Sequence, residues 1–220
     1  MNLDLFAGAD VPLPDRGERE ELAPGAWILR GFSAPRALDF LNAMREIARS
    51  APPRNMTTPG GFRMSVAITN CGRFGWVSDR KGYRYASEDP VSGRPWPALP
   101  ESWERLAREA AEAAGYPDFK PDACLINRYE VGNRMSLHQD RDERDFEAPI
   151  VSVSLGLPAV FQFGGPERSD PVTRCALNHG DVLVFGGPSR LNFHGVAALK
   201  SGEHPLTGAY RYNFTFRRAR

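Results

Sequence analysis

The apolar residues of two segments recur at the spacing of an amphipathic helix. The first segment starts at Ser33, a residue type that favours helix N-caps, passes Pro35 in its first turn and ends at Ser50. Its apolar positions are Leu38, Leu41, Met44, Ile47 and Ala48. The second spans residues 101–114 and precedes Gly115, a residue type common just after a helix. Its apolar face carries Trp103, Leu106, Ala107, Ala110 and Ala114. Both segments are predicted to be helices that pack against a core.

Short apolar runs separated by turn residues predict a β-rich body after residue 121. The candidate strands are residues 123–130, 149–157, 159–163, 172–177, 181–185, 191–197 and 209–217. The Gly, Pro and Asn residues between them are typical of an antiparallel sandwich or barrel. Before this body, strands are predicted at 26–29 and 64–69, and a loop at 51–63, which contains three Pro and two Gly.

Length and composition allow one large domain or two small ones. The 220 residues are 41% hydrophobic, and 28 Lys and Arg stand against 27 Asp and Glu, so the formal net charge is +1. Overall charge therefore neither favours nor excludes a nucleic-acid partner, and any basic surface must be local. Residues 1–25 are rich in Pro, Gly and charge and predict a loosely structured lead-in.

The N-terminus, the apolar stretches and the cysteines predict a cytoplasmic protein that crosses no membrane. The first residues lack the basic and apolar regions of a signal peptide, and no apolar stretch is long enough to span a bilayer. Cys71, Cys124 and Cys175 are odd in number and far apart, so we expect neither a disulfide framework nor a zinc pair. Nothing in the sequence indicates a stable oligomer, and we expect a monomer.

Candidate metal chemistry begins at His138 and Asp140, which one residue separates. In an extended backbone, residues i and i+2 point to the same side and can reach one point. A second His would complete a 2-His-1-carboxylate set, which holds iron(II) and leaves positions open for oxygen chemistry. His194 is the favoured candidate, and His179, in a His-Gly-Asp turn, is a rival. The alternative is a solvated loop, because residues 140–145 are all charged.

The last predicted strand has a polar residue at every second position. Its polar side is Arg211, Asn213, Thr215 and Arg217, and its other side is Tyr210, Tyr212, Phe214 and Phe216. One interpretation is a half-buried strand whose polar face lies in water. The other is a site for a small dicarboxylate, because Arg binds carboxylates bidentately and keeps its charge. Asn127 and Tyr129 share a face of another predicted strand and add groups that could orient such a ligand.

In residues 71–97 the apolar positions show almost no regular spacing, and basic and aromatic residues are interleaved. These residues are Arg73, Phe74, Trp76, Arg80, Lys81, Tyr83, Arg84, Tyr85, Arg94 and Trp96. Such a mixture is typical of surfaces that grip a phosphate backbone and stack bases. From composition alone we favour the other interpretation, a long surface loop whose aromatic side chains pin it to the core.

Taken together, the motifs resemble the AlkB family of iron(II)- and 2-oxoglutarate-dependent alkylation-repair dioxygenases. The segments that carry the resemblance are 117–119, 127–129, 136–140, 151–156 and 211–217, with 59–61 and 69–72 in the N-terminal section. The resemblance covers residues 26–217 and is far more specific than His138 and Asp140 alone. The chain departs from the family pattern at Phe185, where members often carry Trp.

The resemblance implies a mostly β fold with flanking helices (α+β) whose core is a double-stranded β-helix, or jelly roll, with the metal at one mouth. It implies a single dioxygenase domain over residues 26–220. Within that domain, residues 51–97 correspond to a nucleotide-recognition lid and residues 121–217 to the jelly-roll core. Residues 1–25 correspond to a lead-in that varies within the family.

The resemblance also implies site residues by matching position. The catalytic iron ligands would be His138, Asp140 and His194. The 2-oxoglutarate site would be Asn127, Tyr129, Arg211, Asn213 and Arg217. In the lid, Trp76 would stack on the flipped base and Tyr83 would reach a phosphate, while Asp142 would lie near the exocyclic amine of that base. The positions that match backbone contacts less securely are Thr58, Arg134, Gln139, Arg141 and Arg168.

The implied activity is oxidative demethylation of bases such as 1-methyladenine and 3-methylcytosine in single- or double-stranded DNA, or in RNA. Iron(II) would be the cofactor, 2-oxoglutarate and oxygen the co-substrates, and succinate and formaldehyde the released products. Two alternatives stay open. One is the same dioxygenase chemistry on RNA or protein, and the other is a non-catalytic jelly roll that binds nucleic acid.

Overall fold

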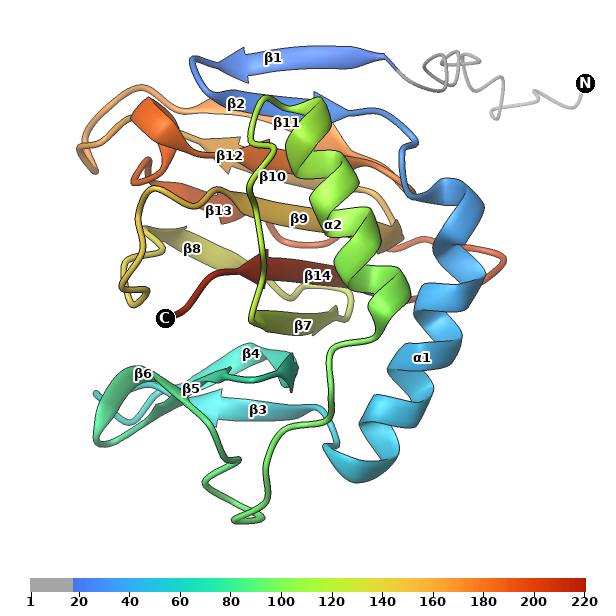
Figure 1. Ribbon diagram of the computed structural model, residues 1–220, viewed down its shortest axis with the longest axis vertical. Helices are drawn as coiled ribbons and strands as arrows, with labels where there is room; N and C mark the ends of the chain where they lie inside the picture. Colours follow the sequence, from blue (N-terminus) through green and yellow to red (C-terminus); the bar gives the residue numbers. More distant parts are fainter. Residues whose placement is uncertain (1–17) are drawn as a thin grey trace, which may run out of the picture.

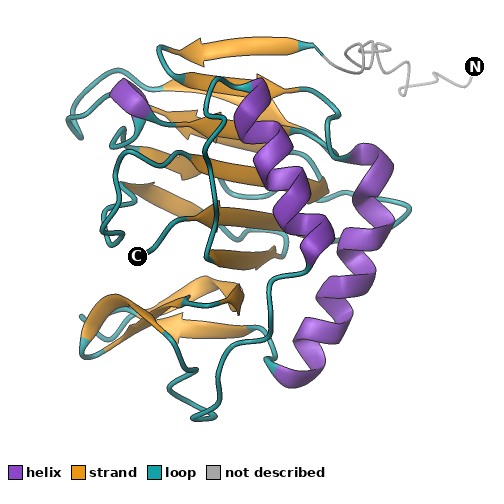
Figure 2. Ribbon diagram, in the orientation of Figure 1, coloured by secondary structure: helices purple, strands orange, loops and turns teal. Residues whose placement is uncertain are grey.

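Two β-sheets, a β-hairpin and two α-helices make up residues 18–220, the part of the chain that the computed structural model describes (Figures 1 and 2). The helices are α1 (Ala37–Ser50) and α2 (Glu101–Ala113), and the short 3-10 helices are η1 (Ala34–Arg36) and η2 (Gly187–Ser189). Figure 1 shows α1 and α2 lying across the same face of the main sheet. No helix among these residues is long and apolar enough to cross a membrane.

The strands pair only with antiparallel neighbours. The main sheet has the order β1 (Arg19–Ala23), β2 (Ala26–Leu29), β12 (Val182–Phe185), β9 (Ile150–Gly156), β14 (Arg211–Arg217), β7 (Ala123–Tyr129), β4 (Arg63–Gly72) and β3 (Arg54–Thr57). The second sheet has the order β11 (Thr173–Leu177), β10 (Ala159–Phe163), β13 (His194–Val196) and β8 (Met135–His138). The hairpin is β5 (Gly75–Asp79) and β6 (Gly82–Ala86).

The central strands of the main sheet are buried on both faces, because the helices cover one face and the second sheet covers the other. In β12, Val182 and Val184 belong to the apolar cluster that includes the helices, whereas Leu183 and Phe185 pack with Phe161 of the second sheet. The mostly β jelly-roll fold with flanking helices is therefore confirmed. Its interior, between the two sheets, is where polar side chains of β7, β9 and β14 point.

Both predicted helices are present, and aromatic rings join them to the sheet. The rings of Phe40 and Trp103 stack with centroids 4.8 Å apart, and both meet Phe214 edge-on. Gly115 has a φ of +94°, as expected after the end of α2. Ser33 stands at the N-cap position of η1, directly before α1, but its side chain makes no capping hydrogen bond: the hydroxyl donates to the carbonyl of Gly180 and does not accept from a backbone N–H of the helix.

All seven strands predicted after residue 121 are present, but the sequence pattern missed five short strands. The lead-in was predicted to lack regular structure, yet Arg19–Ala23 forms β1, and residues 1–17 lie outside the described part. The predicted loop at 51–63 contains β3, and the non-periodic stretch 71–97 contains β5 and β6. β8 is four residues long with Ser and His at two positions, so apolar alternation could not reveal it.

Candidate active site

The interior of the jelly roll holds a cavity of about 990 Å³ between the two sheets and the β5–β6 hairpin. Every residue predicted to bind metal, 2-oxoglutarate or nucleic acid lines this one cavity. These residues are Thr58, Trp76, Tyr83, Asn127, Tyr129, Arg134, His138, Gln139, Asp140, Arg141, Asp142, Arg168, His194, Arg211, Asn213 and Arg217. Residues that lie up to 159 positions apart thus converge, which no single sequence window could show.

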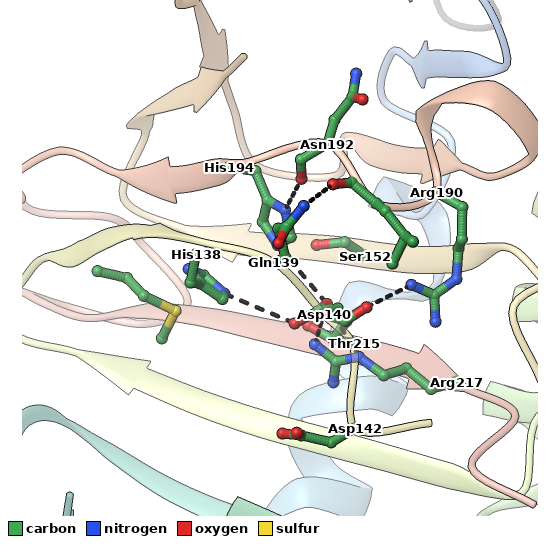
Figure 3. A network of polar contacts seen from close by, with 12 residues as sticks. His138, Gln139, Asp140, Asp142, Ser152, Arg190, Asn192, His194, Thr215 and Arg217 are labelled. Atoms are coloured by element: carbon green, nitrogen blue, oxygen red, sulfur yellow. Dashed lines mark hydrogen bonds and ion pairs between the residues drawn. The ribbon is translucent and has the colours of Figure 1, made fainter. Parts of the chain in front are cut away.

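Three ligand-type side chains meet on the second sheet and on the loop after it. His138 ends β8, His194 begins β13, and these two residues are direct partners in the antiparallel pair. Asp140 follows β8 and reaches both, with carboxylate oxygens 3.7 Å from Nε2 of His138 and 3.6 Å from Nε2 of His194 (Figure 3). The ligand atoms of the three lie within 4.8 Å of one another, a spacing that suits one metal ion.

Backbone carbonyls orient both imidazoles for ligation. Nδ1 of His138 lies 2.9 Å from the carbonyl oxygen of Ser136, and Nδ1 of His194 lies 2.9 Å from that of Asn192. We assign the ring proton to Nδ1 in each case, because a carbonyl only accepts, and this leaves Nε2 free for a metal. Phe185 packs edge-on against the ring of His194, with centroids 5.1 Å apart, so the smaller aromatic residue still supports this ligand.

The charge states of the cluster are those that a metal requires. Burial opposes the charge of Asp140, but Arg217 and the two imidazoles outweigh burial and hold the pKa of this carboxyl well below its usual range. Nη2 of Arg217 donates to Asp140 over 2.6 Å. Burial and the neighbouring His194 lower the pKa of His138 to about 4. At neutral pH the site therefore offers an ionised carboxylate and a neutral imidazole, both competent ligands.

The rival ligand His179 is occupied elsewhere. Its Nδ1 accepts a hydrogen bond from the backbone N–H of Gly156, and its ring stacks on His204 with centroids 4.3 Å apart. His179 does not line the cavity that holds His138 and Asp140. Within residues 18–220, the only cluster of three or more potential ligands with this spacing is the one that contains His194.

Arg211 is a buried cation without a carboxylate partner among the described residues. Its side chain is 1% exposed, and its donors reach the hydroxyl of Ser154 and the carbonyls of Leu157 and Leu177. Its Nε has no hydrogen-bond partner, and burial lowers the pKa of this guanidinium to about 10. A buried charge in this state is costly unless an anion joins it, so the structure favours a carboxylate ligand here.

The polar face of β14 lies inside the protein, so the interpretation in which that face meets water is wrong. Asn213 donates to the hydroxyl of Ser152, and its side-chain carbonyl accepts from Asn127 and Thr215. Asn127 is the direct partner of Asn213 across β7 and β14, and its own side-chain oxygen has no partner within the described chain. Arg217 differs from Arg211, because it already forms an ion pair with Asp140.

The β5–β6 hairpin brings an aromatic pair to the mouth of the cavity. The rings of Trp76 and Tyr83 stack with centroids 5.5 Å apart, and the indole N–H of Trp76 donates to Asp142 over 2.7 Å. The side chain of Asn70 holds Trp76 in place by accepting from its backbone N–H and donating to its carbonyl. A partly exposed aromatic surface therefore stands beside a carboxylate and lines the same cavity as His138 and Asp140.

The less secure positions also line the cavity, and the side chains of three of them already form hydrogen bonds within the protein. Gln139 donates to the carbonyls of Pro166 and Leu191, and Arg168 donates to the carbonyl of Leu137. Thr58 closes the β3–β4 turn by accepting from Phe62. Arg134 and Arg141 line the same cavity.

Sequence reasoning missed several residues at this site. Phe62, at the tip of the β3–β4 turn, is 78% exposed and lines the mouth of the cavity. Tyr85, Glu143 and Arg190 form a buried polar network next to Asp140. Glu143 stands in a run of charged residues that looks solvated, so no sequence signal separated it from its neighbours.

Comparisons with known proteins agree with this geometry. The model of the 2OG-Fe(II) oxygenase superfamily matches residues 25–217. The Alpha-ketoglutarate-dependent dioxygenase AlkB of Salmonella typhimurium is 57% identical, and that of Escherichia coli is 56% identical. Each match covers 99% of this chain and 98% of the relative. A solved structure of OsALKBH1 superposes with a TM-score of 0.80 at 27% identity, covering 91% of this chain and 100% of that one.

Proposed function

The chain belongs to the AlkB family within the 2OG-Fe(II) oxygenase superfamily, and we propose that it repairs N-alkylated nucleic-acid bases by oxidative demethylation. It is an iron(II)- and 2-oxoglutarate-dependent dioxygenase. The observation that carries the substrate assignment is the pairing of Trp76 with Asp142 at the mouth of the cavity that holds the metal cluster. An aromatic face beside a carboxylate suits a flat, positively charged base.

Iron would be held by His138, Asp140 and His194, whose free Nε2 atoms and ionised carboxylate match the donors that iron(II) accepts. When bound, the iron supplies oxygen activation, with 2-oxoglutarate as the source of electrons. The surrounding protein supplies position and charge.

The 2-oxoglutarate site fits the polar interior of β7 and β14. We assign the unpaired guanidinium of Arg211 to the carboxylate of the co-substrate that is remote from the metal, because Arg211 lacks any other anion. Burial raises the pKa of Tyr129 to about 12, so its hydroxyl stays protonated and can donate to the same carboxylate. Asn127 and Asn213 line the pocket between these groups and the metal cluster, and Arg217 lies at the metal end.

The substrate base would stack on Trp76 and place its N-methyl group over the metal cluster. Oxygen supplies two atoms: one enters succinate as 2-oxoglutarate loses carbon dioxide, and the other enters the methyl C–H bond. The C–N bond of the resulting N-hydroxymethyl group then breaks: its electron pair stays on the base nitrogen, formaldehyde leaves, the hydroxyl proton is released to solvent, and the neutral repaired base remains. 1-Methyladenine and 3-methylcytosine are cations, so Asp142 favours them over neutral bases by charge.

Methylated bases are also easier to extrude from a duplex, because the methyl group blocks Watson–Crick pairing. Tyr83, which stacks on Trp76 and is 48% exposed, would meet the phosphate of the extruded nucleotide. Arg134 and Arg141 on the rim would contact neighbouring phosphates, with Thr58, Gln139 and Arg168 shaping the path. With a net charge of +1, binding then rests on a few local contacts and weakens with salt.

One experiment separates this proposal from the two alternatives. The protein is incubated with iron(II), 2-oxoglutarate and oxygen, together with DNA or RNA oligonucleotides that carry 1-methyladenine or 3-methylcytosine, and succinate, formaldehyde and the oligonucleotide mass are measured. We expect succinate, formaldehyde and loss of the methyl mass. Succinate without any change in the nucleic acid would point to another substrate, and no succinate at all would point to a binding module. The ratio of DNA to RNA turnover identifies the preferred nucleic acid.

A further inference from the structure

The loop that carries the metal-binding carboxylate has no regular backbone structure. Residues 139–149, between β8 and β9, contain neither helix nor strand, yet they hold both Asp140 and Asp142. A metal ligand must be placed to within a fraction of an ångström, and a loop without ladder hydrogen bonds does not place it unaided. Side chains from other elements must therefore fix this loop.

Arg190 provides that fixation from the opposite side of the loop. Its side chain is 3% exposed and donates three hydrogen bonds, all to the loop: Nη1 to the carbonyl of Asp140 over 2.7 Å, Nε to the carbonyl of Ala148 over 3.0 Å, and Nη2 to the carboxylate of Glu143 over 3.1 Å. Figure 3 shows the guanidinium of Arg190, the residue directly after η2, pointing toward Asp140. One guanidinium thus spans the loop from its start to its end.

Glu143 extends this network in two directions. Its carboxylate accepts from the hydroxyl of Tyr85 over 2.6 Å, and it lies 3.2 Å from Nε of Arg217, which also binds Asp140. Tyr85 belongs to β6 of the hairpin that carries Trp76. Glu143 is therefore the junction between Arg190, the metal-binding carboxylate and the hairpin over the cavity. The side chains that form this junction, Glu143, Arg190, Tyr85 and Arg217, are buried.

We propose that Arg190 is a positioning residue for Asp140, and that Glu143 and Tyr85 connect this position to the β5–β6 hairpin. The proposal rests on the assignment of the metal site made above. Arg190 does not touch the metal; it fixes the backbone from which the ligand projects. Partners of metal ligands commonly change metal affinity by 10- to 100-fold when they are replaced. Metal binding should in turn order the hairpin through Glu143 and Tyr85.

Manganese(II) affinity of the metal-free protein, measured without oxygen by titration, tests the first part. Arg190→Met removes all three donors, and Arg190→Lys keeps the charge beside Glu143 without the span of a guanidinium. We expect Arg190→Met to weaken manganese binding roughly 10- to 100-fold, and Arg190→Lys to restore only part of the loss. Glu143→Gln, a milder change, should also weaken binding, and it keeps the test decisive if Arg190→Met does not fold.

Arg30→Met is the matched control, because Arg30 also donates to a carbonyl and a buried carboxylate, those of Ala176 and Asp181, away from the metal cluster. We expect it to lower the midpoint of thermal unfolding without changing manganese affinity. If Arg190→Met and Glu143→Gln both bind manganese as the wild type does, the proposal is overturned. If the wild-type protein itself fails to bind, the metal assignment is at fault instead.

Amide hydrogen exchange of the hairpin tests the second part. In the wild type, manganese should slow exchange in β5 and β6. Tyr85→Phe keeps the ring and removes the hydroxyl that binds Glu143, so this slowing should be lost while manganese affinity changes less than in Arg190→Met. Equal slowing in Tyr85→Phe and the wild type would overturn the connection to the hairpin.

Discussion

The interior site and the hairpin above it hold their functional side chains in different ways. In the interior, Asp140 is fixed by Arg217 through its carboxylate and by Arg190 through its carbonyl, and all three are largely buried. In the hairpin, Tyr83 is 48% exposed and is held by stacking on Trp76, whose ring makes one hydrogen bond, to Asp142. The proposed reacting centre is thus fixed by several buried polar contacts, whereas the proposed base-binding surface is held by fewer.

This difference separates two kinds of function. Substitutions in the interior should abolish or weaken the chemistry whatever the substrate, because they remove ligands or buried charges. Substitutions in the hairpin and rim should change which substrates are used and how tightly they bind. The expected effects on turnover and binding decrease from the interior site to the hairpin and the rim.

Asp140→Ala should reduce turnover below detection on every substrate, because it removes a metal ligand and leaves Arg217 without its ion pair. The measurement is formaldehyde release with saturating iron and 2-oxoglutarate. Asp145→Ala is the matched control from the same charged run; Asp145 pairs with the half-exposed Arg218, and its loss should leave turnover intact. Retained turnover in Asp140→Ala would remove Asp140 from the ligand set.

Arg211→Met should raise the KM for 2-oxoglutarate roughly 100-fold, from the loss of about 3 kcal/mol of charge-assisted hydrogen bonding. The metal-free variant should unfold at the same temperature as the wild type or higher, because an unpaired buried charge has been replaced by an apolar chain. Arg128→Met, on the neighbouring strand β7, is the control, since this Arg pairs with Glu130 at the surface. An unchanged KM in Arg211→Met would contradict its assignment.

Asp142→Ala should lower kcat/KM about tenfold on cationic lesions and much less on neutral etheno-type lesions, because it removes a charge beside the base. Asp142→Asn tests the charge separately, since its amide oxygen can still accept from the indole of Trp76. Both variants should lose more kcat/KM on cationic lesions than on neutral lesions. Equal loss on the two lesion classes would exclude this role for Asp142.

Arg134→Ala should have the smallest effect, a modest weakening of oligonucleotide binding that is uniform across sequences. The slope of log affinity against log salt should become shallower by about 0.7 for single strands, the value expected for one lost phosphate contact. Arg105→Ala on α2, outside the cavity, is the control. A slope that does not change would remove Arg134 from the phosphate path.

Periodicity predicted the helices and the seven C-terminal strands, because it is a local signal. The full set of residues around the cavity was implied by the family resemblance, which local motifs such as 136–140 and 211–217 carry. The sequence could not predict that Glu143 is buried while Asp145 is partly exposed, because both stand in one charged run and only their partners from β6 and β14 distinguish them. Arg190 was missed for the same reason. Its role depends on a loop 50 residues away in the chain.

The most direct test is to measure the ratio of formaldehyde released to adenine restored. The substrate is an oligonucleotide whose single 1-methyladenine carries an isotopically labelled methyl carbon. The protein, iron(II), 2-oxoglutarate and oxygen are mixed, and labelled formaldehyde and the repaired oligonucleotide are counted by mass spectrometry. The account predicts one labelled formaldehyde for each adenine restored, and none with Asp140→Ala. Consumption of 2-oxoglutarate with the methylated base left intact, on DNA and RNA alike, would contradict it.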